Sequence, residues 1–517
     1  MPRGPQRFGV KRAQTKGAIN RLSKPADVIV SADLTVLFLT PKLCHNFADR
    51  SAKPLPDGAL PMQLFRLLAA ALAALLLIGC NEEVETGLHI SPAGHSFAFL
   101  PLPLAKTVSV QVVWPMPWAL DDAQNPVVPH LAVKMMLFGG SVDMPAQTLQ
   151  SKVSELGAEA YLAASGVTLR TAVNAPPAAL DQAVALTNSL LRTPALPVEL
   201  LPEVREAAAA SRTEVYARAS ERAFLALRMI VMKDQPSYSE SVSFADIGLI
   251  NSVTLADVQN WHAQTVVSKG ALIAVAGPVD VDAAGRAVDL LLAGLPDTAA
   301  PDTTILPMHM GPRRILLHVP AAKDALLAVI APMPPTGDAG EMDDIIGSYL
   351  LGGDDQAMLA KSLTGQLGAT GVFTAAIDAF SRKNRILVMS GQVKPDQIAV
   401  AEQAVITAYT RMATQPPDPT ELARWTGKLA TSLAAVENDA ANRAGAMLES
   451  MLDGNNPMVI LQLNAMLTKV TPESVQQRFA TAYAPAADLI FVAISPDAAA
   501  LPGACVILQP KDVLNCP

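Results

Sequence analysis

The side chains with the most scope for chemistry occur in a short apolar segment, residues 130–141 (HLAVKMMLFGGS). One histidine, His130, and one lysine, Lys134, stand there among aliphatic residues and methionines. Imidazole is a common zinc ligand, but a helical zinc site needs two histidines about one turn apart on one face. After residue 80 the histidines are at 89, 95, 130, 262, 309 and 318, and no two are three to five residues apart. The segment therefore predicts an apolar helix that ends at Gly139 and Gly140.

The composition limits the classes of function. Half of the 517 residues are hydrophobic and only 4% are aromatic, so stacking platforms for single-stranded nucleic acid are not expected. Residues 1–80 contain 11 Lys and Arg against 4 Asp and Glu, which leaves 28 against 43 for the rest of the chain. An acidic body of this kind repels a phosphate backbone, so no nucleic-acid partner is expected.

A predicted targeting signal precedes the main part of the chain. Arg66 is followed by twelve apolar residues, 67–78, which are too few to span a bilayer as a helix but suit the core of a signal peptide. The run leads into residues 77–80 (LIGC), which resemble the lipobox of bacterial lipoproteins, where the cysteine thiol is lipidated. A short buried helix is the alternative. Residues 62–80 are therefore predicted to be a lipoprotein signal peptide, with Cys80 as the lipidation site.

The segment before this signal, residues 1–61, is basic, lacks sustained periodicity and would place the signal at an internal position. Translation is therefore expected to start at Met62. The likeness to bacterial lipoproteins implies a periplasmic protein anchored to the cell envelope by acyl chains, which hold a protein stably when there are two or more. Asn81 after the cysteine favours the outer over the inner membrane. In this oxidising compartment Cys505 and Cys516 could close a disulfide loop, or remain two unrelated thiols.

An internal repeat organises the rest of the chain. Three separated blocks recur later in the sequence, and all three are displaced by the same number of positions. The matching blocks are 104–117 with 320–334, 253–259 with 470–476, and 272–276 with 489–493. A single offset across separated blocks is difficult to obtain by chance, so the chain is predicted to contain two homologous halves.

Each half has the same predicted order of elements. Residues 108–112 (VSVQV) alternate between apolar and polar, which is the period of a half-buried strand. Helices follow, including an Ala-rich run over 198–231 and a helix capped by Thr254 in one half or Thr471 in the other. The last predicted element is a buried apolar strand, at 272–276 and 489–493.

Long helices and mixed strands in each half predict an α+β fold. Two homologous domains are expected, each a mixed or antiparallel sheet with helices packed on one face. Pro, Asp and Thr are frequent between them, as in an exposed linker. The predicted divisions are the leader at 1–61, the signal at 62–80, the first domain at 81–294, the linker at 295–312 and the second domain at 313–517.

Two such halves in one chain resemble the M16 metallopeptidases, the family of pitrilysin, insulinase and the mitochondrial processing peptidases. Residues 135–141 (MMLFGGS) are similar to the segment H-M-L-F-K-G-T that closes the family's metal-binding helix, and residues 155–160 (ELGAEA) to its strand entry E-L-G-G-x-x-N-A. Residues 190–196 (LLRTPAL) resemble its helix exit, and residues 351–353 (LGG) the glycine-rich helix start of its carboxyl domain. The likeness implies the fold of this family over most of the chain.

Catalysis in this family uses a helix with H-x-x-E-H, whose imidazoles bind zinc while the glutamate activates the metal-bound water. The resemblance places these positions at Leu131, Lys134 and Met135. An aliphatic chain cannot bind zinc, a thioether is a poor zinc ligand and an ammonium repels the ion. His130 lies one residue out of register, about 100° around the helix axis. No cofactor, zinc included, is therefore expected.

The remaining catalytic positions are also changed. The family's third zinc ligand is a glutamate on a later helix, for which Glu206 and Glu214 are candidates, although both suit a solvated helix surface. The family's second half contributes an Arg and a Tyr that hold the substrate and stabilise the oxyanion, and the resemblance places them at Thr364 and Gly371. Both halves thus keep the scaffold without the reactive side chains, which is the pattern of a pseudo-peptidase.

Three functions are compatible with these features. The favoured one is a non-catalytic subunit that pairs with a catalytic M16 peptidase and helps to enclose peptide substrates, because two-chain members of the family often include one chain without the zinc motif. The second is a stand-alone lipoprotein that binds peptides or the envelope, for example through exposed sheet edges. The third is a zinc peptidase with displaced ligands. In the favoured case the chain is not an enzyme by itself, and its partners are the peptidase, peptides and the membrane that holds its anchor.

Overall fold

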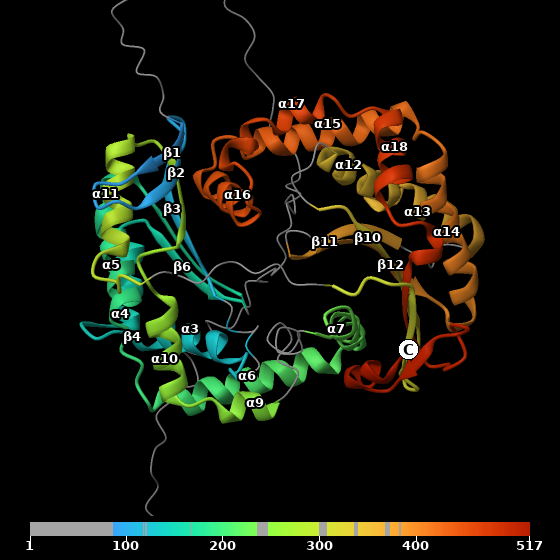
Figure 1. Ribbon diagram of the computed structural model, residues 1–517, viewed down its shortest axis with the longest axis horizontal. Helices are drawn as coiled ribbons and strands as arrows, with labels where there is room; N and C mark the ends of the chain where they lie inside the picture. Colours follow the sequence, from blue (N-terminus) through green and yellow to red (C-terminus); the bar gives the residue numbers. More distant parts are fainter. Residues whose placement is uncertain are drawn as a thin grey trace, which may run out of the picture.

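The computed structural model describes residues 86–517 except 117, 119–120, 122, 166, 235–246, 299–307, 336–339, 368–372 and 382–383. The predicted leader, the signal segment with Cys80 and part of the 295–312 linker lie outside these residues. Within them the chain forms two six-stranded sheets in one molecule, each with its own layer of helices (Figure 1). None of the helices in this described part has the length and apolar character needed to cross a membrane.

The first sheet is built by the first half of the chain, in the order β1-β2-β8-β3-β7-β6. β2 runs parallel to β8 and the other neighbouring strands are antiparallel, so the sheet is mixed. The strands are β1 (Gly87–Ile90), β2 (Ser96–Pro101), β3 (Val108–Pro115), β6 (Glu159–Ala164), β7 (Thr168–Ala175) and β8 (Leu272–Gly277).

The second sheet repeats this order from edge to edge as β14-β9-β13-β10-β12-β11. Its strands are β9 (Arg313–His318), β10 (Ala325–Met333), β11 (Phe373–Ser381), β12 (Asn384–Val393), β13 (Ile490–Ser495) and β14 (Cys505–Ile507). The start of β9 follows the start of β2 by the same offset that separates β10 from β3, so the sequence repeat is a repeat of strands. One edge differs, because β14 lies parallel to β9 where β1 lies antiparallel to β2. The prediction of an α+β fold in two homologous halves is confirmed.

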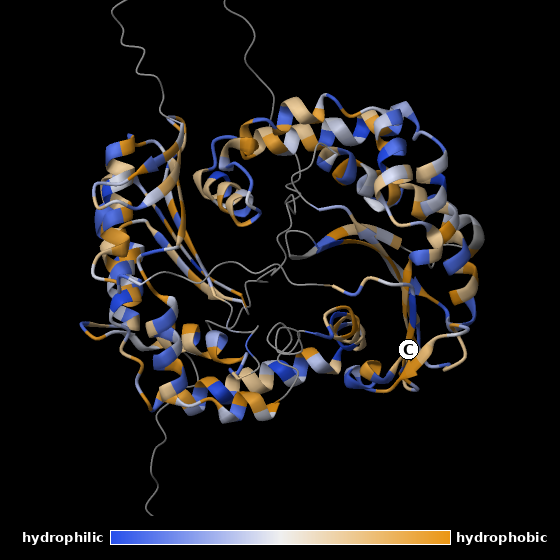
Figure 2. Ribbon diagram, in the orientation of Figure 1, coloured by the Kyte–Doolittle hydropathy of each residue, from blue (hydrophilic) through white to orange (hydrophobic). Residues whose placement is uncertain are grey.

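One face of each sheet is covered by helices of the same half, whose apolar sides face the strands (Figure 2). In the first half these helices are α3 (Val128–Gly139), α4 (Ala146–Glu155), α5 (Leu180–Arg192), α10 (Leu255–Thr265) and α11 (Val281–Leu292), and α6 (Leu200–Ala217) packs on α3. In the second half they are α12 (Glu341–Gly352), α13 (Met358–Leu367), α14 (Ile398–Thr414) and α18 (Pro472–Ala482), and α15 (Pro419–Ala435) packs on α12.

The opposite face of each sheet carries a helix from the other half. α7 (Ala219–Val231) shares a core with strands of the second sheet, where Ile230 lies among Ile315 and its neighbours. α16 (Ala440–Leu452) shares a core with the first sheet, where Met447 lies among small strand residues. Figure 1 shows both helices between the two sheets. Because α7 follows α6 and α16 follows α15, equivalent helices of the two halves are exchanged, and the exchange ties the halves together.

This exchange corrects the prediction that helices cover a single face of each sheet. The alternation in residues 108–112 predicts a solvent-facing side, but Ser109 is fully buried and Gln111 is half-buried because α16 covers that side. The Gln111 amide donates to the Ala441 carbonyl of α16 (2.8 Å). Arg170 of β7 and Glu449 of α16 form an ion pair across the same junction.

The predicted helix starts are present in both halves. Thr254 begins α10 with a capping box, in which its hydroxyl accepts the Asp257 amide (3.2 Å) and the Asp257 carboxylate accepts the Thr254 amide (2.7 Å). Thr471 begins α18 with a capping box of the same kind. The predicted helical run over 198–231 is broken at Arg218, where the backbone is extended (φ −78°, ψ 122°), and this break lets α7 leave its own half.

Candidate functional site

The three positions expected to be degenerate all lie on α3. The helix begins after Asn125, whose side chain accepts a backbone amide at its start (3.0 Å) and donates to the Leu249 carbonyl (2.8 Å). It ends at Gly139, and the next residue, Gly140, has φ +77°, a conformation that favours glycine. A Cβ on Gly140 would lie 2.4 Å from the Ala146 amide nitrogen, so no other residue fits without a shift of the backbone. A Cβ on Gly139 would lie 2.7 Å from the Pro197 Cδ, so both glycines have a structural reason.

The two positions at which the family has histidines are part of the apolar core. Leu131 and Met135 are both fully buried (0% exposed) in the core that α3 forms with the first sheet. Lys134 beside them is half-buried, and this burial lowers the pKa of its ammonium group. The segment that raised the question of a metal site is therefore a core helix with one partly desolvated cation.

The helix that packs on α3 also lacks a ligand. Glu206 and Glu214, the candidates for a third ligand, are both exposed on α6. The charge that α6 buries is Arg212, which is 4% exposed and has its guanidinium 3.9 Å from the centre of the Tyr216 ring. Burial lowers the pKa of Arg212, and within the described residues its Nε and Nη2 have no hydrogen-bond partner. Sequence reasoning missed Arg212, for which the spacing of four residues to Tyr216 was the available signal.

These residues do not fit a zinc ion. The charged side chains that α3 and α6 withdraw from solvent, Lys134 and Arg212, are both cations, and a dication nearby would be repelled. Over the described ranges, no three His, Cys, Asp or Glu side chains come together in a group that could hold a metal. No step of a zinc-assisted hydrolysis can therefore be assigned to these residues.

The second half shows a matching loss of chemistry. α12 occupies the place of α3, and Gly352 and Gly353 end this helix, so the prediction that they start a helix is wrong. A Cβ on Gly352 would lie 2.2 Å from the Ala375 amide nitrogen of β11, which explains the glycine by close helix–strand packing. Thr364 is exposed on α13 and has no positive charge to offer a substrate, and Gly371 lies outside the described residues.

The cysteines at the end of the chain are joined. Cys505 and Cys516 form a disulfide with their Cα atoms 5.8 Å apart. The bridge links β14 to the short helix η7 (Pro510–Asn515), and these two elements pack on β9 and α7 respectively. The disulfide thereby fixes the last segment of the chain at the place where α7 meets the second sheet. Cys80 lies outside the described residues.

Comparisons with known proteins agree with this architecture. Residues 252–425 match the family model described as peptidase M16 inactive domain. The crystal structure of a peptidase M16 inactive domain from Pseudomonas fluorescens matches with a TM-score of 0.70 and 17% identity, over 80% of this chain and 98% of that one. A protease from Helicobacter pylori matches with a TM-score of 0.68 and 13% identity, over 80% of this chain and 99% of that one. A search of curated proteins found no match.

A longer protein contains this architecture as one part. The periplasmic protease PqqL from Escherichia coli matches with a TM-score of 0.62 and 14% identity, over 83% of this chain but 49% of that one. At these sequence identities the solved structures establish a shared fold. The family model that residues 252–425 match describes the inactive domain of M16 peptidases. The resemblance of this chain to the M16 peptidase family is therefore confirmed, and the match falls on the inactive domain of that family.

Proposed function

We propose that this protein is a non-catalytic M16 subunit that pairs with a catalytic M16 peptidase and helps to enclose peptide substrates. One observation carries the proposal: the positions that would bind zinc and activate water are two core residues, Leu131 and Met135, and a cation, Lys134. The scaffold around them keeps a fold that matches the M16 inactive domain from Pseudomonas fluorescens. A retained scaffold without zinc ligands favours a structural or substrate-holding role over hydrolysis.

The match to a longer protease supports pairing with a second region. This chain spans about half of PqqL, so that protease contains a second region of comparable length. This chain supplies two sheets and no metal-binding group within its described residues. In this proposal the active peptidase contributes the zinc site and the other half of the enclosure, and this chain contributes walls and a peptide-binding surface.

The edge of the first sheet offers a way to hold a peptide. β6 is the last strand of that sheet and pairs with β7, and no other strand of the described residues pairs with its outer edge. An extended peptide can add to such an edge as a further strand. Tyr161 at the middle of β6 is 46% exposed and could pack against an apolar side chain of the added strand.

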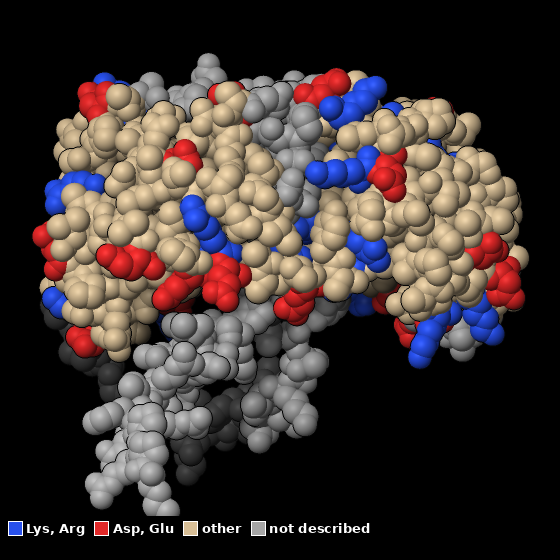
Figure 3. Space-filling view, turned by 90° about the horizontal axis from the view of Figure 1, so that it is seen from below, with Lys and Arg blue, Asp and Glu red and all other residues tan. Residues whose placement is uncertain are grey.

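The proposed location follows from the amino-terminal segment. A lipid on Cys80 would hold the body of the protein on the periplasmic side of the cell envelope, with the outer membrane favoured. On the face drawn in Figure 3, acidic and basic side chains are interspersed and no continuous basic stripe is visible. Such a surface does not favour a nucleic-acid partner. Substitution Cys80→Ser is expected to release the protein from membranes into the soluble periplasmic fraction, and continued sedimentation with membranes would contradict the anchor.

Affinity capture from native envelopes tests the pairing. A carboxyl-terminally tagged chain should retain a protein with H-x-x-E-H, and mixtures of the two should cleave peptides faster than the peptidase alone. The matched control is a peptidase whose motif glutamate is changed to glutamine, because its complex should form without cleavage. A strictly monomeric chain that leaves the peptidase unaffected would overturn the proposal.

The unpaired edge of β6 also fits a second function, a stand-alone lipoprotein that binds peptides or the envelope. Tight binding of extended peptides by the chain alone, with no capture of a peptidase, would favour this function. Metal analysis distinguishes the non-catalytic subunit and the stand-alone lipoprotein from a zinc peptidase with displaced ligands. Stoichiometric zinc together with chelator-sensitive cleavage would support only the zinc peptidase.

A further inference from the structure

A turn with an apolar tip joins β2 to β3 at one end of the first sheet. The Ala105 amide donates to the Leu102 carbonyl (3.0 Å) and closes the turn, and Pro103 and Leu104 form its exposed tip. Leu104 is 79% exposed, the highest value for a large hydrophobic side chain in the described part of the chain. Because burial is what makes a leucine stabilising, packing within the protein does not account for this residue.

The second half contains the equivalent turn of the repeat, between β9 and β10. There the Ala322 amide donates to the Val319 carbonyl (2.9 Å), and the exposed tip consists of Pro320 and Ala321. The same turn therefore forms with a small residue at its tip. The leucine of the first half is not needed to make the turn, so a contact outside this chain is the better explanation for Leu104.

The turn lies at the end of the sheet where the amino-terminal segment enters. Gly87 pairs with Phe99 near the end of β2, and the Leu102 amide donates to the Gly277 carbonyl at the end of β8 (2.8 Å). Gly87 follows Cys80, the proposed lipidation site, by seven positions. Seven residues span at most about 25 Å when fully extended. An acyl anchor on Cys80 would therefore hold this end of the first sheet close to the membrane surface.

The edge strand β1 adds two exposed apolar side chains. His89 packs against two phenylalanines of the helix-side core, with ring centres 5.9 and 6.0 Å apart, so Leu88 and Ile90 project from the other face of the strand. They are 62% and 68% exposed. Four large hydrophobic side chains of the described residues are more than 60% exposed, and three of them are Leu88, Ile90 and Leu104. The strongest apolar exposure is thus concentrated just after the proposed anchor.

The charges at this end of the sheet have both signs. Lys106 is exposed beside the turn, whereas Asp280 and Asp282 are exposed at the start of α11, which follows β8. Attraction to anionic lipids requires a cluster of cations, which this mixture does not provide. A zwitterionic lipid surface fits these side chains better, because the contact then depends on apolar area.

We propose that this end of the first sheet rests on the membrane, with Leu104 inserted among zwitterionic lipids and with Leu88 and Ile90 of β1 close to the same surface. Contacts of this kind strengthen with the apolar area that the lipid covers. Acyl chains alone would leave the protein free to turn on its tether, and the added contact fixes its orientation. The inference rests on the proposed anchor at Cys80 and is independent of the pairing with a peptidase.

An environment-sensitive fluorophore, nitrobenzoxadiazole, tests the contact on the lipidated full chain in vesicles of phosphatidylcholine and phosphatidylethanolamine. The label is attached through Leu104→Cys, and the matched control is Ala321→Cys in the equivalent turn. Cys505 and Cys516 form a disulfide and do not react with the label. We expect emission from position 104 to move to shorter wavelength and to be quenched by nitroxide-bearing lipids, while emission from position 321 stays that of a label in water. Added phosphatidylglycerol should not increase the shift.

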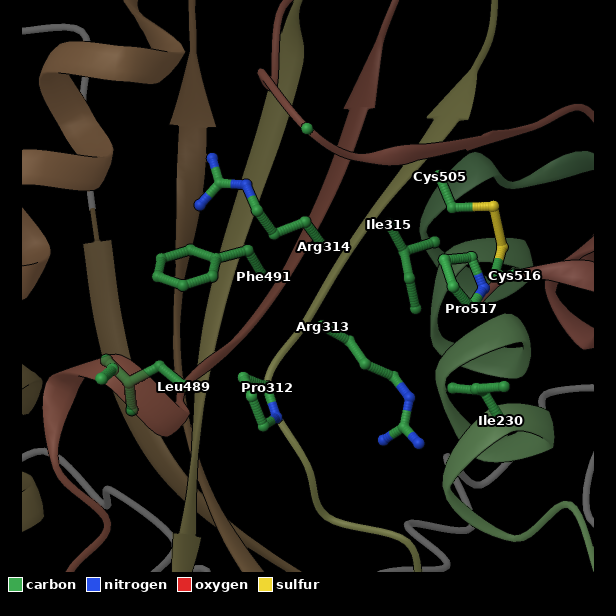
Figure 4. Close-up of a pocket in the computed structure, with 12 residues that line it drawn as sticks. Ile230, Pro312, Arg313, Arg314, Ile315, Leu489, Phe491, Cys505, Cys516 and Pro517 are labelled. Carbon is green, nitrogen blue, oxygen red and sulfur yellow. A yellow bond between two sulfur atoms is a disulfide. The ribbon is translucent and has the colours of Figure 1, made fainter.

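A chain tethered from its other end gives the reference signal. Pro517 lies beside the disulfide and near Ile230 of α7 (Figure 4), and the carboxyl end is on the opposite side of the molecule from β1 (Figure 1). Cys80→Ser with a carboxyl-terminal histidine tag can be held on nickel-chelating lipid. The label at position 104 should then stay in water, and a shift equal to that of the lipidated chain would overturn the proposal.

A further variant tests the leucine side chain, with the label moved to Pro103→Cys. Leu104→Asp should abolish most of the shift, because a carboxylate is costly to place among lipid chains, and an unchanged shift would contradict the proposal. Vesicle sedimentation separates the two proposals. A chain that does not sediment refutes the anchor and this contact together, whereas a chain that sediments with its position 104 label in water refutes the contact alone. A shift that requires an added protein partner would also overturn the lipid contact.

Discussion

The substitution Met135→His tests whether α3 is a core helix that has lost its metal site. Met135 is fully buried, and burial of such a side chain stabilises a fold by about 1.5–3 kcal/mol. A buried imidazole nitrogen without a partner costs about 1–3 kcal/mol more. Together these effects predict that the free energy of unfolding of the first half falls by about 3–5 kcal/mol. Met135→Leu keeps the volume and the apolar character, so this control should lose less than about 1.5 kcal/mol.

Urea unfolding followed by tryptophan fluorescence measures this loss, since Trp114 and Trp261 are fully buried in the core that contains α3. The same titration with added zinc completes the test. Zinc should not restore the stability of Met135→His, because the neighbouring positions, Leu131 and Lys134, cannot complete a coordination shell. A variant as stable as the parent chain, or one that zinc stabilises, would show that α3 retains a usable metal site and would refute the reasoning.

Three further predictions concern stability. The fully buried carboxylate of Asp344 pairs with the guanidiniums of Arg385 and Arg478. Asp344→Asn removes this negative charge and should lower the free energy of unfolding, measured in urea, by about 3–5 kcal/mol. A loss below about 1 kcal/mol would contradict this role. The hydrogen bond from Arg424 is the largest cause that lowers the pKa of Asp354 to about 2, so this ionised group contributes fully above pH 3.8 and loses its contribution as the pH falls toward 2. Asp354→Asn should therefore cost about 1 kcal/mol at pH 7 and progressively less in titrations below pH 4, whereas a pH-independent difference would exclude the ion pair as its cause. Cys516→Ser removes the disulfide that closes a loop of 11 residues and should lower the free energy of unfolding by about 3 kcal/mol in the absence of reductant. If the variant remains less stable than the parent chain after the parent's disulfide is reduced, the loss comes from packing and not from the disulfide.

Much of the fold was accessible from local patterns. The constant offset between matching blocks predicted a repeated unit, and the two sheets have the same strand order because equivalent segments repeat the same apolar strands. Thr254 and Thr471 were recognisable as helix starts, since capping depends on a hydroxyl and a few neighbouring residues. Caps are short-range signals and the repeat is a property of spacing along the chain, so one sequence suffices to find both.

The burial of Gln111 and the site of α7 could not be predicted in the same way. Both depend on which distant helix packs on which sheet, and an Ala-rich helix is equally able to cover its own sheet or that of the other half. The buried Arg212 was missed for a related reason, because the sequence shows a charged helix but not which of its charges faces a neighbour. The two glutamates chosen from the same helix, Glu206 and Glu214, are both exposed.

The sequence by itself determined what the degenerate site cannot do, because the ligand chemistry of Leu131, Lys134 and Met135 is fixed by side-chain type wherever the helix lies. It also determined the repeat, which is a property of spacing along the chain. Only the tertiary structure decided that the halves exchange α7 and α16, and that Arg212 is the charge that α6 buries. These outcomes depend on contacts between segments that are far apart in the chain, and no pattern within one segment fixes which distant segments meet.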